Sequence, residues 1–273
     1  MFVLPPPEDD KLLIPTVGEW SHDKHYYLQR YIDAFTTSMH GKKKWSGLHY
    51  IDLFAGAGIE RRKESGTLEW GSALIAAQAP RHFEALHLCE KNERTYEALV
   101  DRVERVSRGR NDQVLLGDAN IQVLEIIKQI PETALSLAFL DPYGLHLDFA
   151  TLRLLAAKTV DLLVFFPDFL DVVRNLKAYR DKPNSNLDRV LGTSSWRQRI
   201  DRIPQSRRVE EFREIYRSQI KALGYKYFEF ERICAKGHPL YLLIFCSRHP
   251  LAAKLWRGIA KKKANDQHTF DFT

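Results

Sequence analysis

Short apolar runs alternate with segments of helical periodicity over the central part of the chain. Runs of this length, rich in branched and aromatic residues, are typical of buried strands, whereas the spacing of apolar residues between them is typical of helices. Strands and helices that alternate in this way predict a parallel sheet covered by helices, the α/β class. The predicted strands span 48–54, 85–90, 113–117, 135–140 and 160–166, and the predicted helices span 71–79, 92–106, 119–129 and 149–157.

The pattern is different on either side of this region. The N-terminal residues are first proline-rich and then polar, which predicts an extended arm, and a helix with Ser21 as its cap follows over 22–39. Near the C-terminus, two apolar runs over 225–233 and 239–246 are joined by a link that contains a glycine. This arrangement predicts an antiparallel hairpin at the edge of the sheet.

The sheet does not require the segment between its fifth strand and the hairpin. This segment, residues 168–222, holds thirteen Lys and Arg against eight Asp and Glu, so it carries five of the six excess positive charges of the chain. Its middle is loop-like, and its end has helical spacing. The predicted organisation is an N-terminal arm and helix over 1–47, an α/β core over 48–167, a basic helical insertion over 168–222, and the terminal hairpin of the core sheet with a basic tail helix over 223–273.

Composition narrows the class of protein. The 273 residues are 44% hydrophobic and 28% charged, which is ordinary for a globular protein of one large or two small domains. No apolar run reaches the ~18 residues that span a bilayer, and no secretory signal is visible. Three scattered cysteines form neither a disulfide framework nor a metal site, and ten dispersed histidines add no metal motif. We therefore expect a cytoplasmic protein with buried thiols and no metal.

Ligands of open parallel sheets bind beyond the carboxyl ends of the strands, and four ends here carry unusual residues. The first strand runs through Asp52 into a glycine turn at 55–58, where a ligand can approach the backbone closely. A carboxylate at this position suits a cationic ligand better than a pyrophosphate. Arg61 also stands where a dinucleotide fingerprint needs Gly or Ala, so a nicotinamide cofactor is disfavoured. The alternative is a tight turn without a ligand.

The other three strand ends also allow two interpretations each. Glu90 can accept both hydroxyls of a ribose, or it can pair with Lys91 on the surface. Asp118 can accept the amine of an adenine and can also cap a helix, and these roles are compatible. The run Asp-Pro-Tyr-Gly at 141–144 places a carboxylate, a carbonyl and an aromatic face at the rim of the sheet, or simply ends a strand.

Together, Asp-x-Phe-Ala-Gly-x-Gly at 52–58, an acidic end to the second strand, Gly-Asp at 117–118 and Asp-Pro-Tyr-Gly resemble the class I S-adenosylmethionine-dependent methyltransferases. More narrowly, the runs YIDLFAGAGIERR, GTLEWGSALIA, GDANIQVL and LAFLDPYGLHLDFATLRLLA, preceded by KHYYLQRY, resemble the three-Cys-motif partner protein family. That family is named for a neighbouring radical-SAM-like protein that carries the cysteines. The resemblance covers about residues 20–167. It implies a Rossmann-like class I methyltransferase fold, with a mostly parallel seven-stranded sheet and a C-terminal antiparallel hairpin.

The resemblance also implies a role for each residue of the motifs. Asp52 would face the methionyl ammonium or the sulfonium of S-adenosylmethionine, and Glu90 would bind the ribose diol. Asp118 would accept the adenine amine, with Ala119 beside it. The methionine end and the ribose would be held by Phe54, Ala55, Gly56 and Gly58.

The acceptor site implied by the resemblance consists of Asp141, Pro142 and Tyr143. It is similar to the Asp-Pro-Pro-Tyr motif of enzymes that methylate exocyclic amines of bases, but the second proline is missing here. Such an amine is a poor nucleophile because its lone pair is delocalised into the ring. Oxygen acceptors on Asp141 and Pro142 would hold its N–H bonds and free the lone pair, while Tyr143 would stack on the base. Asp141 also borders the predicted cofactor site.

The leading interpretation is a methyltransferase that uses S-adenosylmethionine and acts on nucleic acid or a modified base. One alternative keeps the fold and methylates a small molecule or peptide, as a partner of a radical-SAM-like protein. Another is a non-catalytic scaffold that binds nucleic acid. On the leading interpretation the insertion contacts phosphates, with Arg197, Arg199, Arg202, Arg207 and Arg208 as the candidate residues, whereas the alternative is a solvated basic face.

Overall fold

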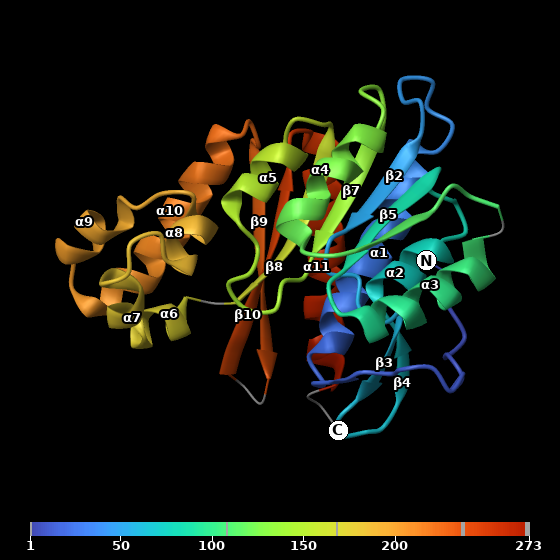
Figure 1. The fold of residues 1–273 in the computed structure, drawn as a ribbon, viewed down its shortest axis with the longest axis horizontal. Helices are drawn as coiled ribbons and strands as arrows, with labels where there is room; N and C mark the ends of the chain where they lie inside the picture. Colours follow the sequence, from blue (N-terminus) through green and yellow to red (C-terminus); the bar gives the residue numbers. More distant parts are fainter. Residues whose placement is uncertain (1, 108, 168, 236–237, 271–273) are drawn as a thin grey trace.

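A seven-stranded sheet forms the centre of the molecule (Figure 1), which the computed structural model describes over residues 2–107, 109–167, 169–235 and 238–270. The strand order is β6-β5-β2-β7-β8-β10-β9. The first five of these strands are parallel, and β10 runs antiparallel to both β8 and β9. This topology confirms the predicted α/β fold with its terminal hairpin. The strands are β2 (Leu48–Asp52), β5 (Ala85–Glu90), β6 (Gln113–Leu116), β7 (Leu135–Leu140), β8 (Val160–Pro167), β9 (Tyr227–Ala235) and β10 (His238–Ser247).

The order in which the chain adds strands reverses beside β2. The chain passes from β2 to β5 and β6 on one side, and then returns to place β7 on the other side. In open α/β sheets the crevice at such a reversal, outside the carboxyl ends of the strands, is where ligands bind. The fold therefore places the candidate site next to the ends of β2 and β7.

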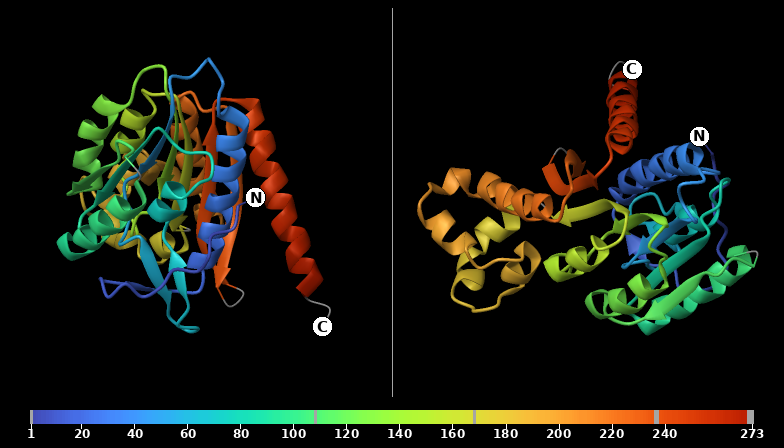
Figure 2. Two further views of the ribbon diagram at one scale, coloured as in Figure 1. Left: turned by 90° about the vertical axis from the view of Figure 1, so that its right-hand side faces the viewer. Right: turned by 90° about the horizontal axis from the view of Figure 1, so that it is seen from above.

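Helices cover both faces of the sheet and bury two separate apolar clusters (Figures 1 and 2). One face carries α4 (Ala119–Gln129) and α5 (Phe149–Leu155). The other carries α1 (Ser21–Met39), α2 (Ser72–Ala77), α3 (Glu93–Ser107) and α11 (Pro250–Phe270). Trp256 of α11 lies against the rings of Tyr27 and Tyr31 of α1, with centroids 5.5 and 5.8 Å apart. Aromatic packing of this kind fixes α1 on the sheet.

The polar stretch after the glycine turn forms a second, smaller sheet. In it, β1 (Thr16–Val17) pairs parallel with β3 (Ile59–Arg62), which pairs antiparallel with β4 (Leu68–Trp70). The predicted N-terminal arm is thus extended but paired to the core. The predicted capping role of Ser21 is wrong, because its hydroxyl donates a 2.6 Å hydrogen bond to Glu60 of β3 and the helix begins after Trp20.

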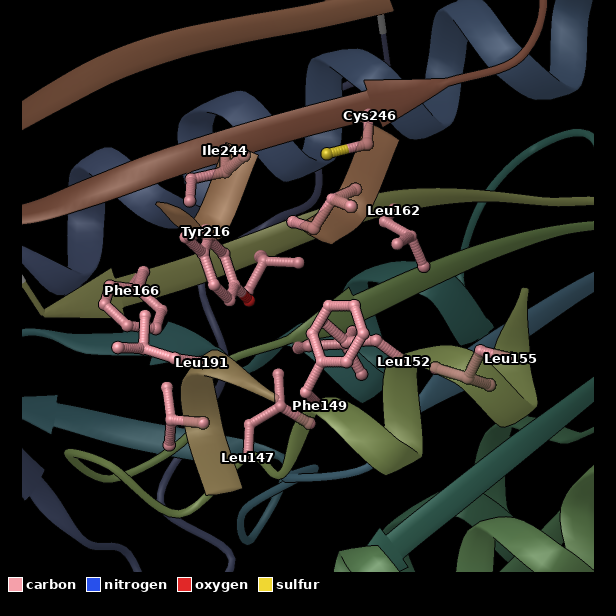
Figure 3. Packing of buried hydrophobic residues seen from close by; sticks show 14 of the residues in the cluster. Leu147, Phe149, Leu152, Leu155, Leu162, Phe166, Leu191, Tyr216, Ile244 and Cys246 are labelled. Carbon is pink, nitrogen blue, oxygen red and sulfur yellow. The ribbon is translucent and has the colours of Figure 1, made fainter. Parts of the chain in front are cut away.

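The insertion is helical throughout most of its length. The loop-like middle predicted for 184–188 is wrong from residue 186 onward, since α8 begins after Ser185, whose side chain forms a reciprocal capping box with Asp188. The loop predicted from Gly192 is confirmed over 192–195, between α8 and α9. Leu191 and Tyr216 of the insertion pack with Phe166 of β8 in the same buried cluster (Figure 3). Its helices are α6 (Leu170–Arg174), α7 (Leu176–Arg180), α8 (Asn186–Leu191), α9 (Trp196–Asp201) and α10 (Arg208–Ala222), with a 3₁₀ turn over Gln205–Arg207.

Gly192 brings the insertion into close contact with α5. Its φ of +67° lies in the left-handed region, and a Cβ atom there would come within 2.4 Å of the Phe149 ring. Only glycine satisfies both demands.

Two predictions from composition concern the described part of the chain. Cys89 and Cys246 are buried free thiols, as expected, while the side chain of Cys234 lies outside the described residues. No described helix combines the length and the apolar character needed to cross a membrane.

Candidate active site

Strand register aligns four carboxylates along the carboxyl edge of the sheet. Asp52 pairs with Leu88 of β5 on one side and with Phe139 of β7 on the other. Glu90 stands two residues after Leu88, and Asp141 stands two residues after Phe139. Glu90 pairs in turn with Leu116 of β6, and Asp118 stands two residues after Leu116. Adjacent parallel strands end at the same edge, so the order along it is Asp118, Glu90, Asp52 and Asp141. The structure thus brings the four predicted strand ends together.

Asp52 is fully buried at the end of β2. Its carboxylate accepts hydrogen bonds from the Tyr50 hydroxyl and the Phe54 amide, each 3.2 Å long. Burial raises the pKa of Asp52 to about 7, against the opposing hydrogen bonds from Ser72, Phe54 and Tyr50. Asp52 supports the glycine turn and supplies negative charge from beneath it.

The glycine turn and Glu90 are joined directly. The Gly56 amide donates a 3.1 Å hydrogen bond to Glu90, whose other oxygen accepts one from Asn92 at 2.8 Å. Ala55 donates from its amide to the carbonyl of Cys89, so the turn is held against the end of β5. Gly56 has a φ of +63° and open space where a Cβ would stand. A ligand can therefore approach the backbone at Gly56, beside a carboxylate whose orientation is fixed.

Asp118 and Ala119 lie at the start of α4. Asp118 accepts a 3.0 Å hydrogen bond from the Asn120 amide, which confirms its capping role. Its second oxygen pairs with Lys91 at 2.9 Å, and this hydrogen bond, against partial burial, holds the pKa of Asp118 below its usual value. The surface partner considered for Glu90 thus binds Asp118 instead. Ala119 is buried, so it contributes packing and backbone at this position.

Asn120 links the Asp118 end of the edge to the loop after β7, residues 141–148, a role that the sequence analysis missed. Its amide group donates to the His146 carbonyl, while its oxygen accepts from the Asp148 amide and the Thr151 hydroxyl, at distances between 2.7 and 2.9 Å. The loop after β7 is therefore fastened to α4. Asn120 belongs to the Gly-Asp-Ala-Asn run, but nothing in the spacing shows that it reaches this loop.

The three predicted acceptor residues have different environments. Asp141 is partly buried, Pro142 is buried, and the Tyr143 side chain is 92% exposed. A large aromatic face so open to solvent at the sheet edge is available to stack on a planar ligand. The Oδ2 atom of the Asp141 carboxylate accepts a 2.7 Å hydrogen bond from the ammonium of Lys24, and its Oδ1 atom has no hydrogen bond from the part of the chain that the structure describes.

Lys24 is the charged neighbour that the sequence analysis did not assign. It lies in the first turns of α1 with its side chain only 10% exposed, and Glu60 is its second partner at 3.8 Å. Burial opposes its charge, but Asp141 and Glu60 raise the pKa of Lys24 above its usual value. The adjacent His25 is buried with no hydrogen bond to either ring nitrogen from the described residues, and burial lowers its pKa to about 4. His25 is therefore neutral and Lys24 charged at neutral pH.

The N-terminal arm is tied to the glycine turn by a buried arginine of α3. Arg102 donates to the Ala57 carbonyl at 2.6 Å and to the Leu13 carbonyl at 3.0 Å, and it forms two hydrogen bonds with Asp10. Burial of this ion pair makes it costly to break on one side only. The arm thus fixes the position of the turn, a link that local sequence does not show.

The arginines predicted to bind phosphates fall into three groups. Arg197 bridges the insertion internally, bonding to Asp188 and to three backbone carbonyls while its guanidinium stacks on Trp196. Arg199 pairs with Glu211. Arg202 and Arg207 are exposed, and Arg208 is half-buried at the start of α10. Arg199 is exposed as well but is held by Glu211, so Arg202 and Arg207 are the members of this set best placed for contact with a partner.

A cavity lies at the opposite edge of the sheet. It measures about 1060 Å³, and its lining includes His49, Phe83 and His87 near the amino ends of β2 and β5. None of the predicted site residues lines this cavity. The candidate site is therefore separate from this cavity and is defined by the aligned carboxylates and the glycine turn at the carboxyl edge.

Comparisons with known proteins bear on the fold. No family model and no curated protein matches the chain. Among solved structures, protein LPL1258 from Legionella pneumophila, described under the family model DUF519, shares 16% identity, covers 86% of this chain and 89% of its own, and has a TM-score of 0.53.

Two more distant likenesses have TM-scores below 0.5. TYW2 of P. horikoshii, solved in complex with MeSAdo, shares 12% identity over 88% of this chain and 66% of its own, with a TM-score of 0.43. Magnesium protoporphyrin IX methyltransferase from Synechocystis, solved with bound SAH, shares 12% sequence identity over 84% of this chain and 86% of its own, with a TM-score of 0.39.

The fold is methyltransferase-like by its strand order and hairpin. The resemblance to the three-Cys-motif partner family rests on the sequence runs and stays a prediction.

Proposed function

We propose that the protein is an S-adenosylmethionine-dependent methyltransferase that acts on an exocyclic amine of a base in nucleic acid. The observation that carries the proposal is the alignment of Asp118, Glu90, Asp52 and Asp141 along one edge, with the glycine turn between them. A dinucleotide would place a pyrophosphate at this turn, beside the buried carboxylate of Asp52. A cofactor with a cationic methionyl end suits that charge better.

The residues at the edge fit the cofactor. Open space at Gly56 admits a ligand to the backbone, and Glu90 is oriented by two amides so that its remaining lone pairs can bind a ribose diol. Asp118 lies partly exposed at the outer end for an adenine amine. The cofactor supplies an electrophilic methyl group on a sulfonium.

The acceptor residues supply orientation. Asp141 Oδ1 has no hydrogen bond from the described residues, so it is available to accept an N–H of the amine, with the Pro142 carbonyl as the second acceptor. With the methyl group supplied by the bound cofactor, the alkylated nitrogen would become more acidic, and Asp141 would accept its proton and pass it to water. Correct placement of the two reacting atoms contributes most of the acceleration. Exposed Tyr143 would stack on a base that has left its helix.

Nucleic acid is favoured as substrate by the place of the insertion. The insertion follows β8, whose end lies beside that of β7, and α6 and α7 lie to one side of the sheet (Figure 1). Arg189 of α8 also pairs at 3.2 Å with Asp148 of the acceptor loop. The basic segment is thus continuous with the acceptor side of the edge, where its exposed cations can contact a polyanion.

Removing either carboxylate from the adenosine side should weaken cofactor binding. We expect the wild-type protein to bind S-adenosylhomocysteine with micromolar affinity, and Glu90→Ala or Asp118→Ala to weaken binding by about 1–3 kcal/mol, the cost of losing a polar partner. Isothermal titration calorimetry measures both. Glu125→Ala, on an exposed salt bridge of α4, is the control. Unchanged affinity in both site variants would disprove the assigned positions of ribose and adenine.

Binding to nucleic acid should depend on salt and on the exposed arginines. We expect affinity for single-stranded RNA to fall linearly with the logarithm of salt concentration, by about 0.7 per phosphate contacted. Arg202→Ala with Arg207→Ala should flatten this slope without changing affinity for S-adenosylhomocysteine. Fluorescence anisotropy over a salt series measures it, with Lys42→Ala and Lys43→Ala on a distant turn as control. Absence of binding to RNA and DNA at low salt would instead favour a small-molecule or peptide acceptor.

A further inference from the structure

The charged side chain of Lys24, in the first turns of α1, lies at the candidate acceptor site. Lys24 and Asp141 are 117 residues apart in the sequence, yet their side chains meet at 2.7 Å with both largely withdrawn from solvent. The contact is made by Oδ2 alone. The second oxygen of the same carboxylate is the one that our proposed function assigns to the acceptor amine.

The ammonium of Lys24 is itself held in place. Glu60 of β3 lies 3.8 Å from it, and Glu60 in turn accepts a 2.6 Å hydrogen bond from Ser21 one turn earlier in α1. Burial disfavours the charge of Glu60, but the ammonium of Lys24 and the hydrogen bond from Ser21 keep its pKa below the usual value. The ammonium of Lys24 thus lies between Glu60 of the small sheet and the carboxylate of Asp141.

Docking of α1 does not depend on this ion pair. The helix buries an apolar face of Tyr27, Leu28, Tyr31, Ile32 and Phe35, which supplies the main attachment to the sheet. A buried ion pair is weak as a source of stability, because desolvation offsets much of its attraction. The position of the pair at the reversal between β2 and β7 therefore points to a role at the site.

We propose that Lys24 is a positioning residue for methyl transfer, which fixes one oxygen of Asp141 and so presents the other to the acceptor amine. This inference rests on the proposed function for its effect on catalysis, whereas the orientation of Asp141 is a structural claim of its own. The lysine limits Asp141 to one acceptor oxygen, and the site then needs the Pro142 carbonyl for the second N–H. An acceptor with two N–H bonds, a primary amine, is matched to this pair.

The control for Lys24 is a lysine of similar burial at the other edge of the sheet. Lys158 has a side chain 13% exposed, pairs with Glu132 and donates to the Ile130 carbonyl. Lys158→Met removes a comparable charge and ion pair far from the site. The test series consists of Lys24→Met, Lys24→Gln and Lys24→Arg. Arginine keeps the charge, and glutamine keeps a hydrogen-bond donor. Because there are three variants, the test can still be made if one of them fails to fold.

The activity arm measures transfer of a labelled methyl group from S-adenosylmethionine to unfractionated RNA. We expect Lys24→Met to lower kcat by about 100-fold, the effect of a misplaced group, with unchanged affinity for S-adenosylhomocysteine and little change in KM. Lys24→Arg should recover most of the loss, and Lys158→Met should match the wild-type protein in transfer. Equal losses in Lys24→Met and Lys158→Met, or wild-type transfer by Lys24→Met, would overturn the proposal.

The structural arm does not depend on activity. Crystal structures with S-adenosylhomocysteine should show the carboxylate of Asp141 turned or split between conformers in Lys24→Met, and unchanged in Lys158→Met. An unchanged Asp141 in Lys24→Met would refute the positioning role even if the wild-type enzyme is active. If the wild-type protein transfers no methyl group, the proposed function fails, and this arm alone decides whether Lys24 orients Asp141.

Discussion

Replacing Asp141 with alanine should abolish methyl transfer while leaving cofactor binding nearly intact. Asp141 follows β7, one strand away from the glycine turn, and its free oxygen is the acceptor for the substrate amine in our proposal. Loss of a group that both orients the amine and receives its proton lowers rates by about 100-fold or more. The measurement compares labelled methyl transfer to RNA with calorimetric binding of S-adenosylhomocysteine.

The matched control for Asp141 is Asp148 on the same loop. Its side chain is 23% exposed against 20% for Asp141, and it pairs with Arg189 instead of facing the site. Asp148→Ala should retain transfer, and Tyr143→Phe should do so too if the exposed ring acts by stacking. Full turnover by Asp141→Ala on an acceptor that the wild-type protein methylates would remove Asp141 from the catalytic site.

Asp52→Asn should stabilise the ligand-free protein at alkaline pH and weaken cofactor binding. Burial raises the pKa of Asp52 to about 7, so the folded protein keeps a proton that the unfolded chain releases above its ordinary value of 3.8. The free energy of unfolding therefore falls between about pH 4 and pH 7, and the loss is complete above pH 7. Asparagine resembles the protonated carboxyl group and avoids this loss, which is worth about 2–4 kcal/mol at pH 8.

The same substitution should lower affinity for S-adenosylmethionine, because a neutral amide no longer attracts its cationic methionyl end. Urea unfolding at pH 5 and pH 8 measures the stability, and calorimetry at pH 8 measures the binding. Asp161→Asn is the control for stability. The carboxyl group of Asp161 is also buried, and its pKa is raised to about 6, but it lies at the start of β8, away from the glycine turn. If Asp52→Asn binds as tightly as the wild-type protein at pH 8, Asp52 has no role toward the cofactor.

That the carboxylates lie at a common edge of the sheet could be predicted from the sequence. Parallel strands end at a common edge, and Glu90, Asp118 and Asp141 stand at or just after the ends of three apolar runs, whereas the order along the edge comes from the strand order. The α/β fold could be predicted because strands and helices alternate along the chain. Local rules also predicted the cap at Asp118, because Asp favours that position whatever it binds.

Contacts between distant segments could not be predicted in this way. Lys24 reaches Asp141 only because α1 packs across the sheet, and Arg102 reaches Ala57 and Asp10 only after the arm has folded back. Charge counting treated Arg197 as a candidate for phosphate binding, whereas it binds Asp188 inside the insertion. Each of these residues carries a formal charge, so the sequence predicts a solvent-exposed side chain, whereas in the fold the side chain forms ion pairs and hydrogen bonds.

A crystal structure of the wild-type protein with S-adenosylhomocysteine tests the central claim most directly. The account predicts electron density for the ligand at the carboxyl edge, with the ribose hydroxyls on Glu90, the adenine amine near Asp118 and the homocysteine end against the turn at Gly56. Density in the cavity beside His49 and His87 at the opposite edge, or no density at a ligand concentration far above the expected micromolar dissociation constant, would contradict it.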